Sequence, residues 1–147
     1  MKLAYLITEY KETALILKHL LPQHLMQVTE IVATSTRSSA QSLAGTLMSK
    51  RSRPVALVLN ANTIDTSSIQ EQLTTITTLL LPASSGEPYQ VFLAAPTVVI
   101  LLQNATSPKP ISELLAGLST EQIQSLQQLP LLQQITQFLT NAFAQAA

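Results

Sequence analysis

The stretch that decides the fold is a continuous aliphatic run, Val55-Ala56-Leu57-Val58-Leu59, which is followed by Asn60-Ala61-Asn62-Thr63. Its residues do not alternate between apolar and polar, and such a run is typical of a parallel strand buried on both faces. Asparagine favours turns, because its side chain bonds nearby backbone groups. The stretch therefore predicts a central strand that ends in a polar turn.

Weaker apolar runs lie on either side of this strand. They predict further strands over Lys2–Thr8, Gln27–Ala33 and Gln90–Ala95. Between the strands, apolar residues recur at helical spacing over Glu12–Leu21, Ala40–Met48 and Ile69–Leu80. Strands that alternate with helices indicate a parallel sheet with right-handed crossovers. We expect a three-layer, Rossmann-like α/β fold with about four parallel strands and C-terminal helices.

Local signals around these elements predict where some of them begin. The polar loop Thr34–Ser39 ends in a serine that we expect to cap the helix after it, and Asp65 or Thr66 is expected to cap the next. The run Thr97–Leu102 is compatible with a strand or with the start of a helix, because a short apolar run has no decisive period.

The last third of the chain has a different composition. A polar, proline-containing linker, Asn104–Pro110, divides residues 1–103, an α/β domain, from a helical segment over 104–147. From Leu131 to Phe143 an apolar stripe follows helical spacing, on a segment rich in glutamine. The stripe either packs on the sheet of the same domain, which is the usual role of an amphipathic helix, or docks a partner.

Composition excludes several classes of protein. The 147 residues are 46% hydrophobic and only 11% charged, with a net charge of zero. This excludes a disordered chain and a domain that binds nucleic acid through an overall basic surface. Cysteine is absent, which excludes disulfides and cysteine–zinc sites. The two histidines, His19 and His24, flank Pro22 and do not have the spacing of a metal-binding pair.

Charge is unevenly distributed along the chain. Residues 1–53 have a net charge of +4 and residues 54–147 have a net charge of −4. Lys50, Arg51 and Arg53 form a basic cluster that is a candidate anion-binding patch. The alternative is a solvated helix end, because basic residues are favoured at the C-terminus of a helix.

No stretch has the length of a membrane span or a secretory signal. The longest apolar run, 91–102, is interrupted by Pro96 and is shorter than the roughly 20 residues of a spanning helix. The apolar run near the N-terminus is too short for a signal peptide. We therefore expect a cytoplasmic protein that does not bind membranes.

Few residues are candidates for chemistry. With three glycines in the chain, the glycine-rich phosphate loops are absent, and no serine lies in a nucleophile elbow. The informative residues are Glu9, which follows the first strand, and Asn60 and Asn62, which follow the central one. Functional groups gather at the carboxyl ends of parallel strands, so we expect these three residues to lie near one another.

These residues resemble a TOPRIM domain. The resemblance rests on Leu6-Ile7-Thr8-Glu9 leading into a helix, on the strand and turn over Arg53–Thr63, and on Val91–Pro96. It covers residues 3–102 and is strongest toward the small stand-alone members of a family that also includes primases, topoisomerases and OLD-type nucleases. The resemblance implies a Rossmann-like fold and a role connected with nucleic acid.

The resemblance also implies roles for single residues. Glu9 stands where the family has its general acid or base, and Asn60 and Asn62 stand where two aspartates hold Mg²⁺. Tyr10 replaces the glycine that usually follows the glutamate. Mg²⁺ is held by carboxylates, and two amides remove two negative charges, so the metal site is degenerate. Asp65, the chain's one aspartate, is a further candidate ligand.

Three functions remain open from the sequence. The first is a catalytically degenerate TOPRIM-like module, a pseudoenzyme without a cofactor, which binds a protein partner or self-associates. The second is a divalent-metal-dependent nuclease or related phosphotransferase that uses Glu9 with Asp65. The third is a homo-oligomeric interaction protein that uses the glutamine-rich C-terminal helices. Asn60 and Asn62 are also open to a simple role as turn residues. A nucleic-acid partner is implied by the resemblance alone.

Overall fold

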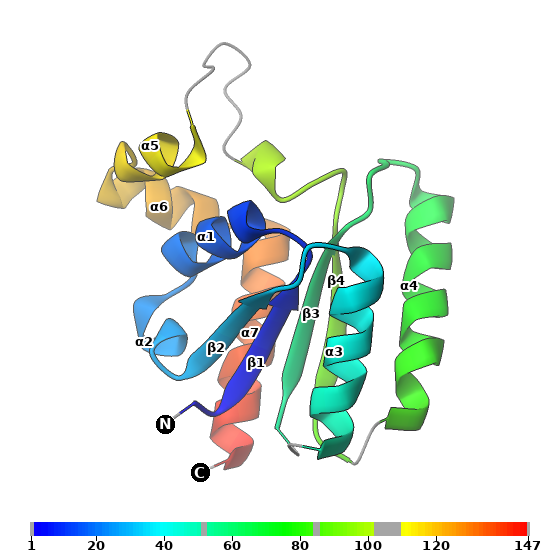
Figure 1. Cartoon of the computed structure of the whole chain (residues 1–147). Helices are drawn as coiled ribbons and strands as arrows, with labels where there is room; N and C mark the ends of the chain where they lie inside the picture. The colour runs from blue at the N-terminus through cyan, green and yellow to red at the C-terminus, as the bar shows by residue number, and fades with distance from the viewer. Residues whose placement is uncertain (1, 51–52, 84–85, 102–109, 147) are drawn as a thin grey trace.

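A four-stranded parallel sheet forms the centre of the molecule (Figure 1). The computed structural model describes residues 2–50, 53–83, 86–101 and 110–146. The strands are β1 (Ala4–Thr8), β2 (Thr29–Ala33), β3 (Val55–Asn60) and β4 (Tyr89–Ala94). Their order is β2-β1-β3-β4, so β1 and β3 are the central strands and β2 and β4 are the edges.

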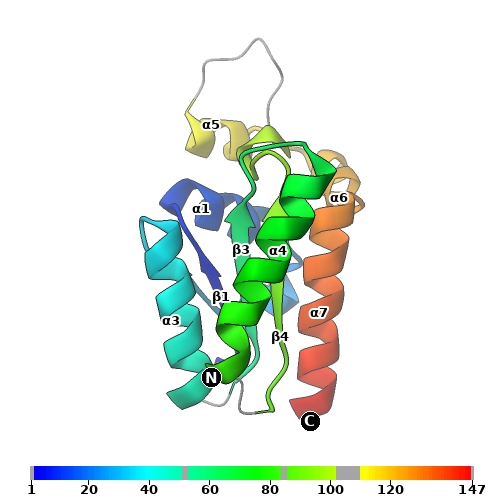
Figure 2. The ribbon, with the colours of Figure 1, turned by 90° about the vertical axis from the view of Figure 1, so that its right-hand side faces the viewer.

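Helices cover both faces of this sheet (Figures 1 and 2). They are α1 (Lys11–Leu20), α2 (Gln23–Met26), α3 (Arg37–Lys50), α4 (Thr66–Leu80), α5 (Ile111–Ala116), α6 (Thr120–Gln127) and α7 (Pro130–Ala146), with short 3-10 helices η1 (Leu81–Ala83) and η2 (Val99–Leu101). α3 and α4 lie on one face, and α1 and α7 lie on the other. The predicted three-layer, Rossmann-like α/β fold is confirmed. None of the described helices is long and apolar enough to cross a membrane.

The central strands are buried on both faces, which explains why their sequences do not alternate. Ala56 and Val58 of β3 face the core beneath α1 and α7, whereas Val55, Leu57 and Leu59 face the core beneath α3 and α4. β1 divides its side chains between the two cores in the same way. Each residue of such a strand meets a helix layer, so an apolar residue is needed at every position.

The apolar stripe of α7 is part of the core. Leu132, Ile135 and Leu139 are fully buried, and Phe138 meets Phe92 of β4 edge to face at 6.0 Å between ring centroids. The C-terminal segment also contacts α1, because the side-chain amide of Gln127 donates to the carbonyl oxygen of Leu20 at 2.7 Å. The stripe therefore completes one face of the sheet.

Most of these elements differ from the predicted ranges by one to three residues at one end or both, and local contacts explain two of the differences. β2 begins at Thr29 rather than Gln27, because the short helix α2 occupies 23–26 and the Thr29 hydroxyl donates to the carbonyl oxygen of Leu25. α3 begins at Arg37, earlier than the predicted serine cap. The hydroxyl of Thr36 accepts a hydrogen bond from the Ser39 backbone N–H at 3.0 Å, so threonine takes the capping role.

Candidate functional site

The loops that follow β1, β3 and β4 meet at the carboxyl edge of the sheet. Glu9 follows β1, Asn60 is the last residue of β3, and the cis peptide bond Ala95–Pro96 follows β4. Glu9 is 4% exposed and Asn60 is 6% exposed, although both are polar. The structure therefore brings together two of the three residues expected there, in a buried position.

The Glu9 carboxylate is used inside this edge. Its Oε1 accepts a hydrogen bond from the backbone N–H of Asn60 at 2.9 Å, across 51 positions of sequence. The backbone oxygen of Glu9 accepts from the N–H of Ser35, which follows β2. Glu9 thus connects the ends of β1, β2 and β3, and its contact with Asn60 is to the backbone rather than to the side chain.

The Asn60 side chain points to the third loop. Its Oδ1 accepts from the backbone N–H of Val98 at 2.9 Å, and its backbone oxygen accepts from Nη2 of Arg37 at 2.8 Å. The residue therefore joins β3 to the segment after β4 and to the first turn of α3. The amide oxygen that would face a metal ion in the resemblance is occupied by a backbone donor.

Arg37 is a residue of this edge that the sequence analysis did not single out. Its Nη2 also donates to Oε1 of Gln72 at 2.9 Å, and Nε2 of Gln72 donates to the carbonyl oxygen of Ala61 at 3.1 Å. The available signal was position, because Arg37 lies in the first turn of the helix that follows β2, at the carboxyl edge. We call Glu9, Arg37, Asn60, Gln72 and Val98 the strand-end network.

Asn62 lies in the turn after β3 and is exposed. Its φ angle is 59°, in the left-handed region that asparagine adopts more readily than other side chains except glycine. Its backbone N–H donates to the carbonyl oxygen of Pro96 at 2.9 Å. This geometry matches the role of a turn residue, which was one of the alternatives for this position.

Asp65 caps α4, one of the two caps expected there. Its Oδ2 accepts from the backbone N–H of Ser68 at 3.1 Å, and the residue is exposed. This carboxylate accepts a hydrogen bond from a backbone N–H that has no partner within the helix. In the described part of the chain, no group of three or more His, Cys, Asp or Glu residues is placed to hold a metal ion.

Substitutions at Asp65 separate the effect of the cap from that of the negative charge. Asp65→Ala is expected to lower the free energy of unfolding by about 1 kcal/mol, because the cap is lost. Asp65→Asn is expected to leave stability within a few tenths of a kcal/mol, because asparagine caps as well as aspartate does. Urea unfolding followed by circular dichroism measures both. An equal loss in the two variants would show that the negative charge matters rather than the cap.

The described residues of the basic cluster, Lys50 and Arg53, lie at the amino end of the sheet, opposite to Glu9. Lys50 is the exposed last residue of α3, and the guanidinium of Arg53 lies 5.9 Å from the ring centroid of Tyr5, near the start of β1. Arg51 is outside the described residues. A helix that follows a parallel strand returns to the amino end of the sheet, so Lys50 and Arg53 lie on a different surface from Glu9.

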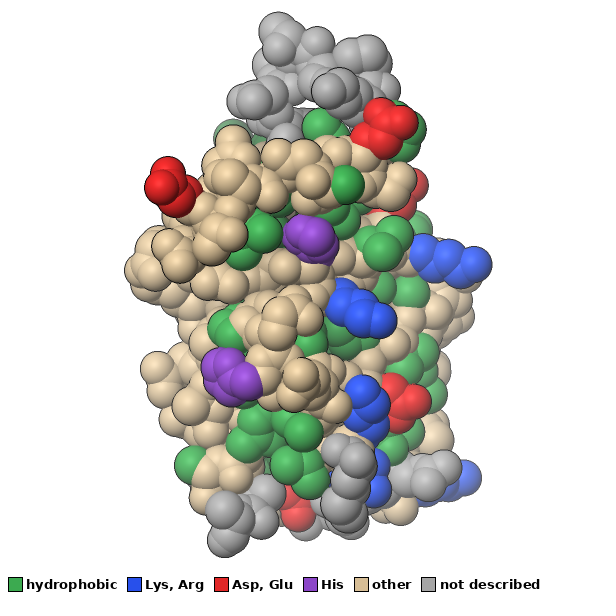
Figure 3. Space-filling model, turned by 90° about the vertical axis from the view of Figure 1, so that its left-hand side faces the viewer, with side chains coloured by type: hydrophobic (Ala, Val, Ile, Leu, Met, Phe, Trp, Pro, Cys, Tyr) green, Lys and Arg blue, Asp and Glu red, His purple; other side chains and the backbone are tan. Residues whose placement is uncertain are grey.

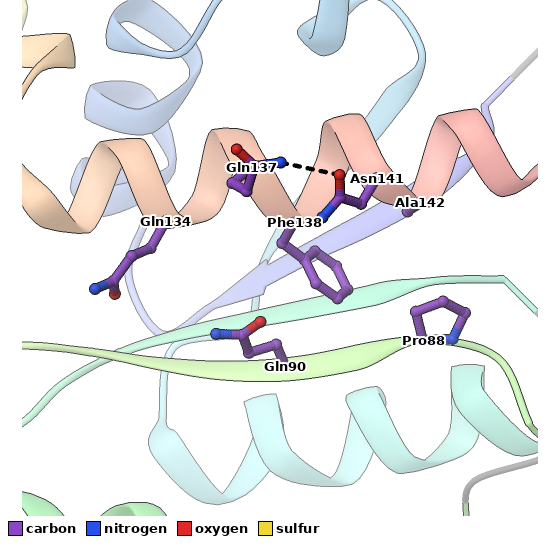
Figure 4. Close-up of a pocket in the computed structure, with 7 residues that line it drawn as sticks. All are labelled: Pro88, Gln90, Gln134, Gln137, Phe138, Asn141 and Ala142. Carbon is purple, nitrogen blue, oxygen red and sulfur yellow. Dashed lines mark hydrogen bonds between the residues drawn. The ribbon is translucent and has the colours of Figure 1, made fainter.

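A small uncharged hollow lies between the edge strand β4 and α7 (Figure 4). Its volume is about 240 Å³, and Gln90, Gln134, Gln137 and Asn141 contribute amides to it. Nε2 of Gln137 donates to Oδ1 of Asn141 at 2.9 Å, so part of this hydrogen-bonding capacity is used within the helix. Gln134 and Gln137 of the C-terminal segment thus line an uncharged hollow on the outside of the fold.

No protein-family model matches the chain, and no curated protein matches it. The resemblance to TOPRIM domains rests on the residues themselves and stays a prediction.

Proposed function

We propose that the chain is a non-catalytic binding module built on a TOPRIM-like α/β domain that has lost metal-dependent phosphoryl chemistry. The observation that supports this most directly is the internal use of the candidate catalytic oxygen of Glu9 and the candidate metal-binding oxygen of Asn60. Glu9 Oε1 and Asn60 Oδ1 each accept a backbone N–H, and both residues are more than nine-tenths buried.

Recruiting these oxygens to a metal ion would disrupt the strand-end network. Moving Asn60 Oδ1 away from Val98 would leave a buried N–H without an acceptor, which costs about 1–3 kcal/mol. The guanidinium of Arg37, bonded to the backbone of Asn60, adds a positive charge beside the position. Like charges repel, so this arginine opposes the binding of a divalent cation.

The same hydrogen bonds suit a binding module. They join the loops after β1, β2, β3 and β4, so the edge that is catalytic in the family has a structural role in this proposal. A module of this kind acts through its outer surfaces, and we propose a protein as its partner. Self-association through the uncharged glutamine-rich surface is the second form of the same function.

A metal titration tests this proposal. We expect the melting temperature to stay constant as the concentration of Mg²⁺ or Mn²⁺ is raised to several hundred micromolar. At a free metal concentration of 100 times the Kd, binding to one site would add about 2.7 kcal/mol of stability. Each kcal/mol corresponds to about 2–4 °C in the melting temperature of a domain of this size. A saturable rise of several degrees that is lost in Glu9→Gln would overturn the proposal.

A cleavage assay tests the enzymatic alternative separately. Single- and double-stranded nucleic acids are incubated with Mn²⁺ and either the natural chain or Glu9→Gln. We expect the same background in both samples. Cleavage by the natural chain alone would replace the binding module with a metal-dependent nuclease.

A further inference from the structure

Helix α1 carries a second side-chain stripe that does not serve the core. Thr13, Ile16, Leu17 and Leu20 are buried against the sheet. Lys11, Ala14, Leu15 and Lys18 follow the i, i+3, i+4, i+7 spacing of one helix face and lie on the outer side. Leu15 is 48% exposed there.

This outer stripe forms one wall of a groove, and the edge strand β2 forms the other. The groove has a volume of about 500 Å³ and is lined on the second side by Met26, Thr29, Glu30 and Ile31, with Lys2 at its end. Figure 3 shows this side of the molecule, with hydrophobic side chains beside several basic ones. Its size and mixed lining are typical of a binding site.

The charges around the groove favour an acidic occupant. Lys2, Lys11 and Lys18 line it together with one acidic residue, Glu30, which leaves a net charge of +2. Nζ of Lys2 donates to the carbonyl oxygen of Gln27, which holds this side chain beside the start of β2. A two-fold pairing with a second copy would place the same lysines against one another, which disfavours that occupant.

Among the described residues, no strand pairs with β2 on its groove side. The backbone oxygen of Val28 accepts from Leu3 and the N–H of Thr34 donates to Thr8, so the even-numbered residues face β1. Residues alternate in a parallel ladder, and Thr29 and Ile31 therefore direct their backbone groups away from β1. An edge of this kind can accept an extended peptide as an additional strand.

We propose that the groove between α1 and β2 binds an extended acidic segment of a partner protein, which adds to β2 as an edge strand. This inference rests on the proposed function and specifies its partner. Carboxylates at alternate positions of the segment share one face of the added strand and pair with Lys11 and Lys18, whereas the side chains between them face the other side. Seven residues of α1 span about 10 Å, the length of about three residues of an extended chain.

Fluorescence anisotropy with a defined probe tests the groove. The probe is a labelled synthetic peptide in which glutamate alternates with valine, and its comparator has glutamine in place of every glutamate. We expect the natural chain to bind the acidic peptide more tightly. The double variant Lys11→Gln/Lys18→Gln is expected to weaken that binding about 2- to 30-fold, as the loss of two exposed ion pairs predicts. Glu30→Gln is expected to strengthen it about twofold.

A control variant separates a local effect from a change in net charge. Ser42→Glu/Thr78→Glu changes the net charge of the chain by the same amount, at exposed positions of α3 and α4 on the opposite face. We expect it to leave the affinity for the acidic peptide unchanged. Two results would overturn the proposal that the groove binds an acidic segment. One is equal binding of the acidic and neutral peptides, and the other is an equal loss of affinity in the control and lysine variants.

Two further outcomes would assign the groove to other occupants and overturn the proposal. One is saturable binding of oleate without binding of the acidic peptide, and the other is a concentration-dependent dimer that Lys11→Gln/Lys18→Gln abolishes. Failure of peptide binding with no metal effect on melting removes the groove and leaves the binding module. A metal-dependent rise in melting temperature removes the module without changing the peptide result.

Discussion

Replacement of Leu139 by alanine is expected to lower the free energy of unfolding by about 2–5 kcal/mol, the range for a buried leucine that leaves a cavity. Leu139 is fully buried in α7, in the core that this helix shares with α1 and with one face of the sheet. At about 2–4 °C per kcal/mol, the melting temperature falls by roughly 4–20 °C. Urea unfolding followed by circular dichroism gives the free energy directly.

Leu79→Ala is the matched control for this experiment. Leu79 is 63% exposed in α4, so the same chemical change there is expected to alter stability by less than about 0.5 kcal/mol. Similar losses in both variants would mean that α7 does not pack on the sheet as described. A stable Leu139→Ala chain would instead favour a C-terminal segment that is free to dock a partner, the alternative left open by its sequence.

Asn60→Ala is expected to lower the free energy of unfolding by about 1–3 kcal/mol. The substitution removes the acceptor of the Val98 N–H and leaves that buried donor without a partner. The strand-end network then loses its bond between β3 and the segment after β4. The measurement is again urea unfolding, and the melting curve without added metal should show the same order of stabilities.

Asn62→Gly is the control for this second prediction. It removes the other amide of the same turn and retains a residue that adopts the φ angle of 59° without strain. We expect a change within about 0.5 kcal/mol. Equal effects at the two positions would contradict the buried role of Asn60. A loss at both positions that appears only with Mg²⁺ present would point to a metal site instead.

The two asparagines illustrate what sequence patterns can and cannot predict about the site. Both were expected at the carboxyl edge because they follow a parallel strand, and both lie there. Their different burial was not predictable, because it depends on the loop after β4 closing over Asn60. Asp65 was predictable as a cap, because capping involves a donor only three residues away.

The groove beside β2 is a second feature that sequence patterns alone could not predict. The stripe of Lys11, Leu15 and Lys18 can be read from the spacing of α1, yet only the order β2-β1-β3-β4 places β2 at an edge next to it. An interior β2 would have had a second strand in place of the groove. The position of the stripe beside an edge strand therefore depends on topology.

The sequence by itself determined the class of fold. Its aliphatic strands, its helical spacings and its caps each involve residues within about four positions of one another, and such local preferences are legible without a structure. Only the tertiary structure decided the hydrogen-bond partners of Glu9 and Asn60. The Glu9 carboxylate accepts from a backbone N–H 51 positions away, and the Asn60 side-chain oxygen accepts from one 38 positions away. These bonds form because the sheet brings distant strand ends together and excludes water from them, so each buried polar group must find a partner there.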